Sequence, residues 1–447
     1  MYTPPKKATA QQGFFLKLED QLDGKHSLYI LANIIDWKVF EDGFRKYYSK
    51  DKGAPAKPIR LMVGLLILKH IRNVSDEVVV EQWSENMYYQ YFCGNEYFEC
   101  KQPCDASELC HFRDRIGDDG MALIFKESIR VNGNDAKEAS VLIDTTVQEK
   151  NITFPTDNKL HRKIIVKCKS IAEKTKITVR QSYKFELKKL GIAQRFRNHP
   201  TNKGKAKKAD KRVKVIAGRL VRELERKLPV QHLYKQDLAL FNRVLRQQKN
   251  DKNKIYSLNE PAVKCISKGK EHKKYEFGNK VAICLTENTG VITGVKSFEE
   301  NIYDGHALKP TLENHTDMTG SNAKEATVDR GCKGNKQIGE TKINIPGPFD
   351  NKKLSKYQQK KQRQKFKRRA SIEPIIGHLK QDHRLGRNFY KGIVGDSINL
   401  LLAAAAFNFK RMMNKWKKNI FMLIQNIVNH ISYIIYCNKT QKRLFKG

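Results

Sequence analysis

The run SVLIDTT at residues 140–146 constrains the fold of this chain more than any other stretch. It is short, apolar and rich in β-branched residues, and an acid, Asp144, follows its apolar core. This pattern is typical of a buried strand, with Asp144 expected at its edge. A sheet domain should therefore begin near residue 138.

The strand pattern resumes only about 130 residues later. Residues 280–285 and 291–298 are β-rich and flank the turn-forming residues 287–290, which predicts a hairpin. Residues 324–329 and 341–345 are further short strand candidates, and a helix is expected from Ser371 onward. The sequence thus predicts a mixed α/β domain that is interrupted after its first strand.

A very basic segment at about residues 170–256 causes this interruption. Apolar residues recur in it at helical spacing, which predicts a folded helical insertion with one apolar stripe: Val213, Ile216, Leu220, Leu224 and Leu228. The stripe would pack on a neighbouring helix or a second subunit, leaving Lys and Arg free for phosphate. We expect a DNA clamp, and a solvated helical hairpin is the alternative. The Lys/Arg run at 352–369 is expected as a solvated loop or a DNA-facing arm.

Helical signals dominate the first part of the chain. Residues 58–73 are apolar on nearly all sides and begin with proline, which predicts a buried helix. Ser75 precedes two acids and reads as a helix cap, and Asp105 with Glu108 forms a capping-box pattern. The last of these helices is expected to end near Gly117. A small helical domain should result.

Charge points to the partner. The chain has 86 Lys and Arg against 47 Asp and Glu, a formal net charge of +39, and a pI near 9.8. A surplus this large repels itself, and the phosphate backbone of nucleic acid compensates it with release of counterions. A ribosome-associated protein or an unusually soluble surface is the alternative, although solubility alone would mix the two signs more evenly.

Cysteine usage and hydropathy bear on the compartment. The nine cysteines lack regular spacing, and no basic start followed by an apolar run marks a secretory signal. A reducing bacterial cytoplasm, close to the nucleoid, is expected. The cluster from Cys93 to Cys110 lacks the knuckle spacing of a zinc site and is expected to hold ordinary thiols. Residues 419–437 are apolar but interrupted by Gln, Asn and His, which favours a packed or dimerising helix over a membrane span.

Three acids have the types and places that metal-dependent DNA cleavage requires. Two metal ions roughly 4 Å apart stabilise the attacking and leaving oxygens of a phosphodiester, and Mg²⁺ requires carboxylate ligands. Two strand-end aspartates and a helical glutamate supply them: Asp144, Asp329 and Glu373. Taken singly, an Asp after a strand is more often a cap or turn residue.

The residues around Glu373 carry a resemblance. Arg369, Glu373 and Lys380 are separated by three and then six residues, which resembles the Tyr/Arg/Glu/Lys signature of DDE insertion-sequence transposases. Phe366 stands where that signature has Tyr. These positions would share one face of a continuous helix. Alternatively, because Pro374 fits only a first turn, Ser371 caps the helix and Arg369 precedes it.

Longer blocks extend the resemblance over most of residues 20–415. The stretch from SIEPIIGHLKQDHRLG to NLLLAAAAFNFKRM is similar to the C-terminal block of insertion-sequence family five. VDRGCKG around Asp329 resembles the second-acid motif of that family, with Cys332 in place of the usual Tyr. YDGHALKPTLE also resembles family sequence, which makes Asp304 and Asp317 weaker competitors for the catalytic place, whereas Asp157 in FPTD is expected to be structural.

The resemblance implies an RNase H-like catalytic domain in which Asp144 ends the first strand, Asp329 follows the fourth and Glu373 lies on a later helix. It implies Mg²⁺, with Mn²⁺ as a substitute, as the cofactor. The expected organisation is a tail at 1–20, a helical DNA-binding domain at 21–137, and a catalytic domain at 138–170 and 256–410. The basic helical insertion at 171–255 and a tail at 411–447 complete it.

The implied activity is cleavage of the ends of an insertion sequence and strand transfer into target DNA by a homodimer, without a membrane. The partner is double-stranded DNA, as terminal inverted repeats and as target. Phosphate or base contacts are expected from residues near the acids and in the helical domain: Arg369, Lys380, Arg330, His111, Arg113 and Arg115. The rival interpretation is a non-catalytic DNA-binding protein descended from a transposase.

Overall fold

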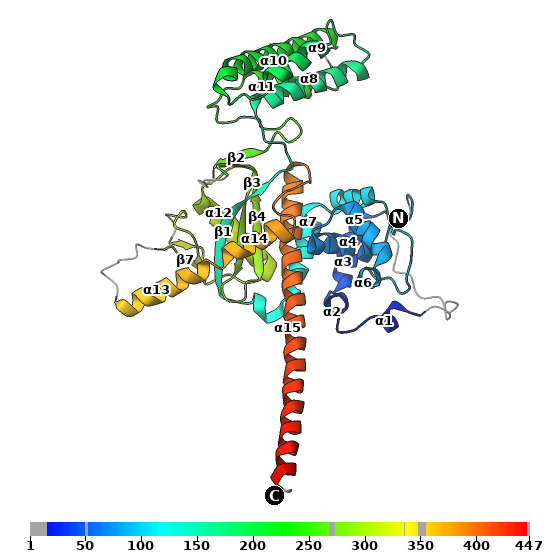
Figure 1. The fold of residues 1–447 in the computed structure, drawn as a ribbon, viewed down its shortest axis with the longest axis vertical. Helices are drawn as coiled ribbons and strands as arrows, with labels where there is room; N and C mark the ends of the chain where they lie inside the picture. Colours follow the sequence, from blue (N-terminus) through cyan, green and yellow to red (C-terminus); the bar gives the residue numbers. More distant parts are fainter. Residues whose placement is uncertain are drawn as a thin grey trace. The chain divides into compact units, whose positions relative to one another are not determined.

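The computed structural model describes residues 16–49, 52–229, 231–267, 273–334, 336–346 and 355–444. The chain divides into two compact units (Figure 1). The first comprises Met1–Gln148, Lys280–Phe298 and Ile302–Gly447, and the second comprises Glu149–Asn279 and Glu299–Asn301. Each unit is described separately below.

The first unit begins with helices, as the sequence predicts. Ser75 caps α5 by accepting a hydrogen bond from the Val78 N–H, and Asp105 forms a capping box with Glu108 at the start of α7. α4 is buried along most of its length. The helices are α1 (Leu18–Gln21), α2 (Ser27–Ile34), α3 (Trp37–Phe44), α4 (Ile59–Arg72), α5 (Asp76–Glu85), α6 (Met87–Phe92) and α7 (Ala106–Val131), with 3-10 turns η1 (Arg45–Tyr47) and η2 (Gly133–Ala136).

The predicted helix end near Gly117 is a kink instead. Gly117 has non-helical backbone angles, φ 56° and ψ −156°, but the helix resumes and runs to Val131. Glycine tolerates this conformation because it has no Cβ. The apolar side chains of Met121, Ile124 and Phe125 are fully buried, so packing continues the helix beyond the kink.

A mixed sheet follows, although residues 264–267 and 275–279 of its strands belong to the second unit as bounded above. Its order is β2-β3-β1-β5-β7-β6, with β4 paired to β3. β3 and β4 are antiparallel around the predicted turn, so the expected hairpin is confirmed, and the predicted strands at 324–329 and 341–345 correspond to β5 and β7. The strands are β1 (Ser140–Glu149), β2 (Lys264–Ser267), β3 (Tyr275–Thr286), β4 (Ile292–Phe298), β5 (Glu325–Thr327), β6 (Gln337–Ile338) and β7 (Thr341–Asn344).

Parallel pairing sets the centre of this sheet. β1 pairs with β5, and β5 pairs with β7, both in parallel. Val141 and Ile143 of β1 pack into one core cluster while Leu142 between them joins another, so the strand is buried on both faces. This mixed α/β arrangement is consistent with an RNase H-like domain.

The expectation that Asp144 ends the first strand is wrong. β1 continues for five residues beyond it, to Glu149, and Val147 and Gln148 are fully buried. The β-branched residues Thr145, Thr146 and Val147 suit an extended strand, and pairing with β3 supplies the hydrogen bonds that prolong it. Asp144 is therefore a mid-strand residue.

The helices after the hairpin are α12 (Asp304–Thr319), α13 (Lys356–Arg369), α14 (Ile372–Asp382) and α15 (Gly392–Leu444). Of the two alternatives, the continuous helix through residues 366–380 is wrong, because the helix is interrupted at Ala370 and Ser371. Arg369 precedes α14, as the other alternative has it, but the Ser371 side chain makes no capping hydrogen bond. Pro374 lies in the first turn of α14, where its missing N–H costs nothing, and Arg369 ends the preceding helix. The basic run is helical from Lys356, not a loop, and residues 352–354 lie outside the described residues.

α15 supplies much of the core of the first unit. Leu400, Leu402 and Phe409 are buried in the same cluster as the N-terminal helices. By length and composition Gly392–Lys418 could cross a membrane, but 72% of its most apolar window is buried within the protein, as in the core helix of a soluble protein. Residues 419–437 continue this helix, and their side-chain packing lies outside the described side chains.

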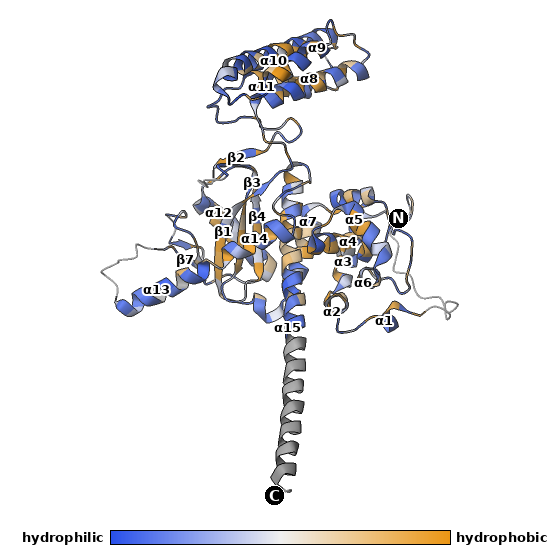
Figure 2. Cartoon of the chain, in the orientation of Figure 1, coloured by the Kyte–Doolittle hydropathy of each residue, from blue (hydrophilic) through white to orange (hydrophobic). Residues whose placement is uncertain are grey.

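The second unit is mainly a helical bundle of α8 (Asp157–Lys174), α9 (Lys184–Ala193), α10 (Pro200–Lys227) and α11 (Lys235–Arg246). The predicted apolar stripe is confirmed for Val213, Ile216, Leu220 and Leu224, which are fully buried and pack within the same unit. Leu228 follows the last residue of α10 and is only partly buried. In Figure 2 the hydrophobic residues of the bundle lie inside it and hydrophilic residues cover its outside.

Candidate active site

Register brings two of the predicted acids together. In the parallel pair of β1 and β5, Leu142 lies opposite Thr327. Asp144 and Asp329 each follow this pair by two residues, and side chains two residues apart on a strand point to the same face. The two carboxylates therefore emerge side by side where β5 has ended.

Arg369 contacts both carboxylates, which shows that they lie close together. Its Nη2 atom lies 3.3 Å from Oδ2 of Asp144 and 3.7 Å from Oδ2 of Asp329. The side chain of Arg369 is 15% exposed, that of Asp144 19% and that of Asp329 53%. Solvent therefore reaches the pair of acids mainly at Asp329. One cationic nitrogen thus lies between the two carboxylates.

Local backbone contacts orient both acids. Oδ1 of Asp144 accepts the Thr145 N–H at 2.8 Å, and Oδ1 of Asp329 accepts the Arg330 N–H at 2.7 Å. The carbonyl of Asp329 also accepts the Cys332 N–H at 3.0 Å, which closes a tight turn after β5. In each case Oδ2 is the oxygen that faces Arg369.

Glu373 is placed differently. It is exposed in the first turn of α14, directly after Ile372, which is fully buried. Ile372 and Leu379 anchor this helix in the core, which leaves Glu373 facing solvent. Within the described ranges, no three His, Cys, Asp or Glu side chains form a group that could hold a metal ion, so Glu373 does not join the two aspartates here.

Asp304, treated as a weaker competitor in the sequence, belongs to the same region. Its Oδ1 accepts hydrogen bonds from Thr145 Oγ1 at 2.7 Å and from Lys280 Nζ at 2.9 Å. Thr145 follows Asp144 directly, so Asp304 braces the strand next to the first acid. The motif YDGH at the start of α12 was the available signal, whereas nothing in the sequence pointed to Lys280. Asp317 lies exposed near the other end of α12.

The negative charge of this region affects the pKa of the neighbouring thiol of Cys332. Its side chain is buried, and burial raises the pKa of the thiol to about 11, with further increases from the carboxylates of Asp304, Asp144 and Asp329. A thiol with this pKa stays protonated at neutral pH and is a poor nucleophile. Cys332 therefore acts as a packing residue under the acids.

The basic residues predicted to bind DNA near the acids lie as follows. Arg369 contacts the two aspartates rather than facing solvent, and its Nε has no hydrogen-bond partner among the described residues. Arg330 is exposed beside Asp329, and Lys380 is half-buried on α14. Arg330 directly follows Asp329 in the chain, whereas Arg369 would have to leave the acids to bind phosphate.

The three candidates in the helical region separate into two groups. His111 and Arg115 are exposed on α7, and the guanidinium of Arg115 lies over the ring of Tyr48 at 4.7 Å. Arg113 is only 4% exposed and makes a bidentate contact with Asp76 at 2.8 and 3.0 Å. The expectation that Arg113 contacts DNA is therefore corrected: it lies on the inner face of α7, where its charge is paired with Asp76.

The donor set suits a hard divalent cation. Carboxylate oxygens are the ligands that Mg²⁺ prefers, and Oδ2 of Asp144 and Oδ2 of Asp329 face one shared cationic nitrogen. Asp144 and Asp329 are the residues that fit a metal ion, because two carboxylates that stabilise a guanidinium between them also stabilise a metal cation at that position.

Comparison with known sequences identifies the protein family. A family described as "Transposase domain" matches residues 16–115, and a second, described as "Transposase DDE domain", matches residues 243–409. The second match contains Asp329 and Glu373, and β1 with Asp144 precedes it. Residues 116–242, which include helices α8 to α10, lie outside both matches.

One curated relative is similar over part of the chain. It is described as "Uncharacterized protein ORF8 in nfe locus" of Rhizobium meliloti, and it is 37% identical over 202 residues, which cover 44% of this chain and 97% of that protein. No solved structure matches significantly. With an N-terminal transposase domain, a DDE domain and two converging aspartates on a mixed sheet, the chain belongs to the DDE transposases of insertion sequences.

Proposed function

We propose that this transposase cuts the ends of an insertion sequence and joins them to target DNA in a metal-dependent reaction, with Asp144, Asp329 and Glu373 as the catalytic acids. The observation that carries the proposal is the convergence of Asp144 and Asp329 on one cationic nitrogen. DDE transposases use divalent metal ions, and Mg²⁺, with Mn²⁺ as a substitute, suits these oxygen donors.

Each residue has a distinct task in this proposal. Asp144 and Asp329 would hold the metal ion, and Glu373 would complete the acidic set from α14. Bound metal would stabilise the charge on the attacking and leaving oxygens of the phosphodiester. Asp304, held by Lys280 and Thr145, keeps β1 in position beside the first acid.

The DNA contacts follow from the exposed basic groups. Arg330, which follows Asp329 in the chain, and Lys380 on α14 would bind phosphates, joined by Arg369 when it leaves the carboxylates. His111 and Arg115 would contact the terminal inverted repeats from the helical domain. The spacing of Arg369, Glu373 and Lys380 supports the Tyr/Arg/Glu/Lys signature group, and the longer sequence blocks support insertion-sequence family five. We further propose action as a homodimer on DNA at the cytoplasmic nucleoid.

The direct test is an end-cleavage assay. Sequencing the DNA around the coding region supplies the inverted repeats, and a labelled duplex carrying one repeat is incubated with the full chain. Cleavage and joining to a second duplex are expected with Mg²⁺ or Mn²⁺ and should disappear with EDTA. Repeat-specific binding without cleavage under any of these conditions would favour the rival function, a DNA-binding protein that has lost catalysis.

Salt dependence tests the phosphate contacts. Lys380→Gln and Arg369→Gln are each expected to weaken DNA binding and to reduce the slope of log K against log salt by about one unit. The measurement is fluorescence anisotropy across a salt series. Lys309→Gln is the control, because Lys309 is exposed and 3.9 Å from Glu313. An unchanged slope for Arg369→Gln would assign this residue to the ion pair with the acids alone.

A further inference from the structure

The loop between α9 and α10 presents an aromatic ring to solvent among cations. Phe196 is 83% exposed, and Arg195 and Arg197 flank it. From Arg195 to Lys208 the sequence contains six Lys or Arg and no Asp or Glu. A single exposed apolar residue needs no explanation by itself. Here the ring lies at the centre of a strongly basic loop, which is a combination found in nucleic-acid contacts.

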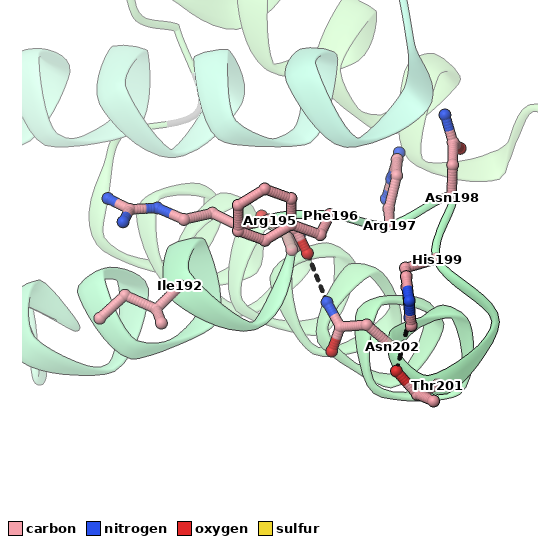
Figure 3. A pocket seen from close by; sticks show the side chains of 9 residues that line it. Ile192, Arg195, Phe196, Arg197, Asn198, His199, Thr201 and Asn202 are labelled. Atoms are coloured by element: carbon pink, nitrogen blue, oxygen red, sulfur yellow. Dashed lines mark hydrogen bonds between the residues drawn. The ribbon is translucent and has the colours of Figure 1, made fainter.

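The backbone holds this ring outward. Phe196 has a positive φ of 50°, in the left-handed region that bulky side chains rarely adopt. The conformation is stabilised on both sides: the Phe196 carbonyl accepts the His199 N–H at 2.9 Å, and the Asn202 amide donates to the carbonyls of Ala193 and Arg195. Figure 3 shows the Asn202 side chain directed back at the backbone of this loop. A residue held in an unfavourable conformation by its surroundings is a reason to look for function.

A polar network fixes the base of the loop. Gln194 accepts from Arg162 at 2.7 Å and donates to Asp210 at 2.7 Å and Asn158 at 2.9 Å, so it joins the loop to α8 and α10. Arg197 forms an ion pair with the same Asp210, so the positive charge of Arg197 is neutralised by that carboxylate. Arg195 is exposed beside the ring. The loop is therefore a rigid support for one aromatic ring and one outward cation.

An open pocket of about 1000 Å³ lies at this loop. Its lining includes Ile192, Arg195, Phe196, Arg197, His199 and Asn202, so apolar and aromatic surface alternates with hydrogen-bond donors (Figure 3). A volume of this size accommodates a small planar group. A nucleobase has both of the properties that such a lining selects: a flat face for stacking and polar edges.

We infer that this loop binds DNA by stacking Phe196 on an unpaired base, while Arg195 and the lysines of the first turns of α10 contact the neighbouring phosphates. Stacking on an aromatic ring is favourable for every base, so the contact would distinguish unpaired from paired bases without a preference for sequence. The inference rests on the proposed function for its DNA substrate. It adds a preference for unpaired or distorted DNA to a segment, residues 192–208, that lies outside both family matches.

The test compares three duplexes of one arbitrary sequence: fully paired, with one bulged base, and with an abasic residue in the bulge. Binding to the full chain is measured by anisotropy in EDTA, so no cleavage is needed. The wild type is expected to bind the bulged-base duplex about tenfold more tightly than the abasic one. Phe196→Ala should abolish this preference, and Phe185→Ala should keep it, because Phe185 is 79% exposed on α9 of the same unit.

A second variant reports the contact directly. Phe196→Trp is expected to retain the preference and to show additional indole fluorescence that is quenched by the bulged-base duplex but not by the abasic one. Equal binding of all three duplexes by the wild type, or an unchanged preference in Phe196→Ala, would overturn the inference. Since metal-dependent cleavage is measured separately, a wild type that prefers the bulged base without cutting DNA would contradict only the proposed function.

Discussion

Asp144→Asn and Asp329→Asn are each expected to reduce metal-dependent strand cleavage by roughly a thousandfold or more, because loss of a metal ligand removes several kcal/mol of transition-state stabilisation. Glu373→Gln should have the same effect, although the described residues form no complete three-acid metal site in this structure. DNA affinity should stay nearly unchanged, since each variant changes one charge on a chain of net charge +39.

The measurements are end cleavage with Mg²⁺ and anisotropy binding on the same duplex. Asp317→Asn is the matched control, because this acid lies exposed near the far end of α12 and should leave cleavage intact. Wild-type cleavage by any of the three variants would remove that residue from the catalytic set. If Glu373→Gln alone remained active, Asp304 would become the next acid to test, since it already lies next to Thr145.

Asp76→Asn is expected to destabilise the first unit by about 3–5 kcal/mol, as the loss of one partner in a buried ion pair does. Asp76 holds two cations: Lys69 Nζ at 2.8 Å and Arg113 at 2.8 Å, with side chains only 3% and 5% exposed. Lys69 also donates to the Tyr390 hydroxyl at 3.0 Å, which ties α4 to the segment before α15. Without the carboxylate, two buried positive charges would repel each other.

The comparison with Lys69→Met isolates the cause. This variant should lose less folding stability than Asp76→Asn, because Arg113 still neutralises Asp76 after Lys69 is removed. Glu81→Gln, an exposed change on the same helix α5, should be close to neutral. Denaturant unfolding followed by circular dichroism measures all three. Equal losses for Lys69→Met and Asp76→Asn would show that packing around Lys69, rather than charge balance, sets the stability.

The same cluster predicts a pH dependence. Burial by itself would raise the pKa of Asp76, but Lys69 and Arg113 outweigh it, so the pKa lies below its ordinary value. A carboxylate with a lowered pKa in the folded state contributes stability that is complete above its unfolded pKa of about 3.9. That contribution is lost as the pH falls through the lower, folded pKa. The stability difference between the wild type and Asp76→Asn should therefore shrink below about pH 4.

The sequence by itself determined the elements whose cause is local. The caps at Ser75 and Asp105, the hairpin around residues 287–290 and the buried stripe of α10 all depend on neighbouring residues along the chain, and each is present. Periodicity within α10 identified which residues are buried, because a helix repeats its faces every three to four positions.

Tertiary structure decided the roles of the charged residues. The family resemblance placed Arg113 among DNA contacts, and sequence spacing allowed Arg369 to share one helix with Glu373. In the structure Arg113 is paired with Asp76 inside the unit, and Arg369 ends a separate helix beside Asp144. Ionic partners are chosen by proximity in space, and burial decides whether a charge faces solvent or a carboxylate. The adjacency of Asp144 and Asp329 likewise follows from the parallel register of β1 and β5, strands almost 180 residues apart in the chain, which no local pattern encodes.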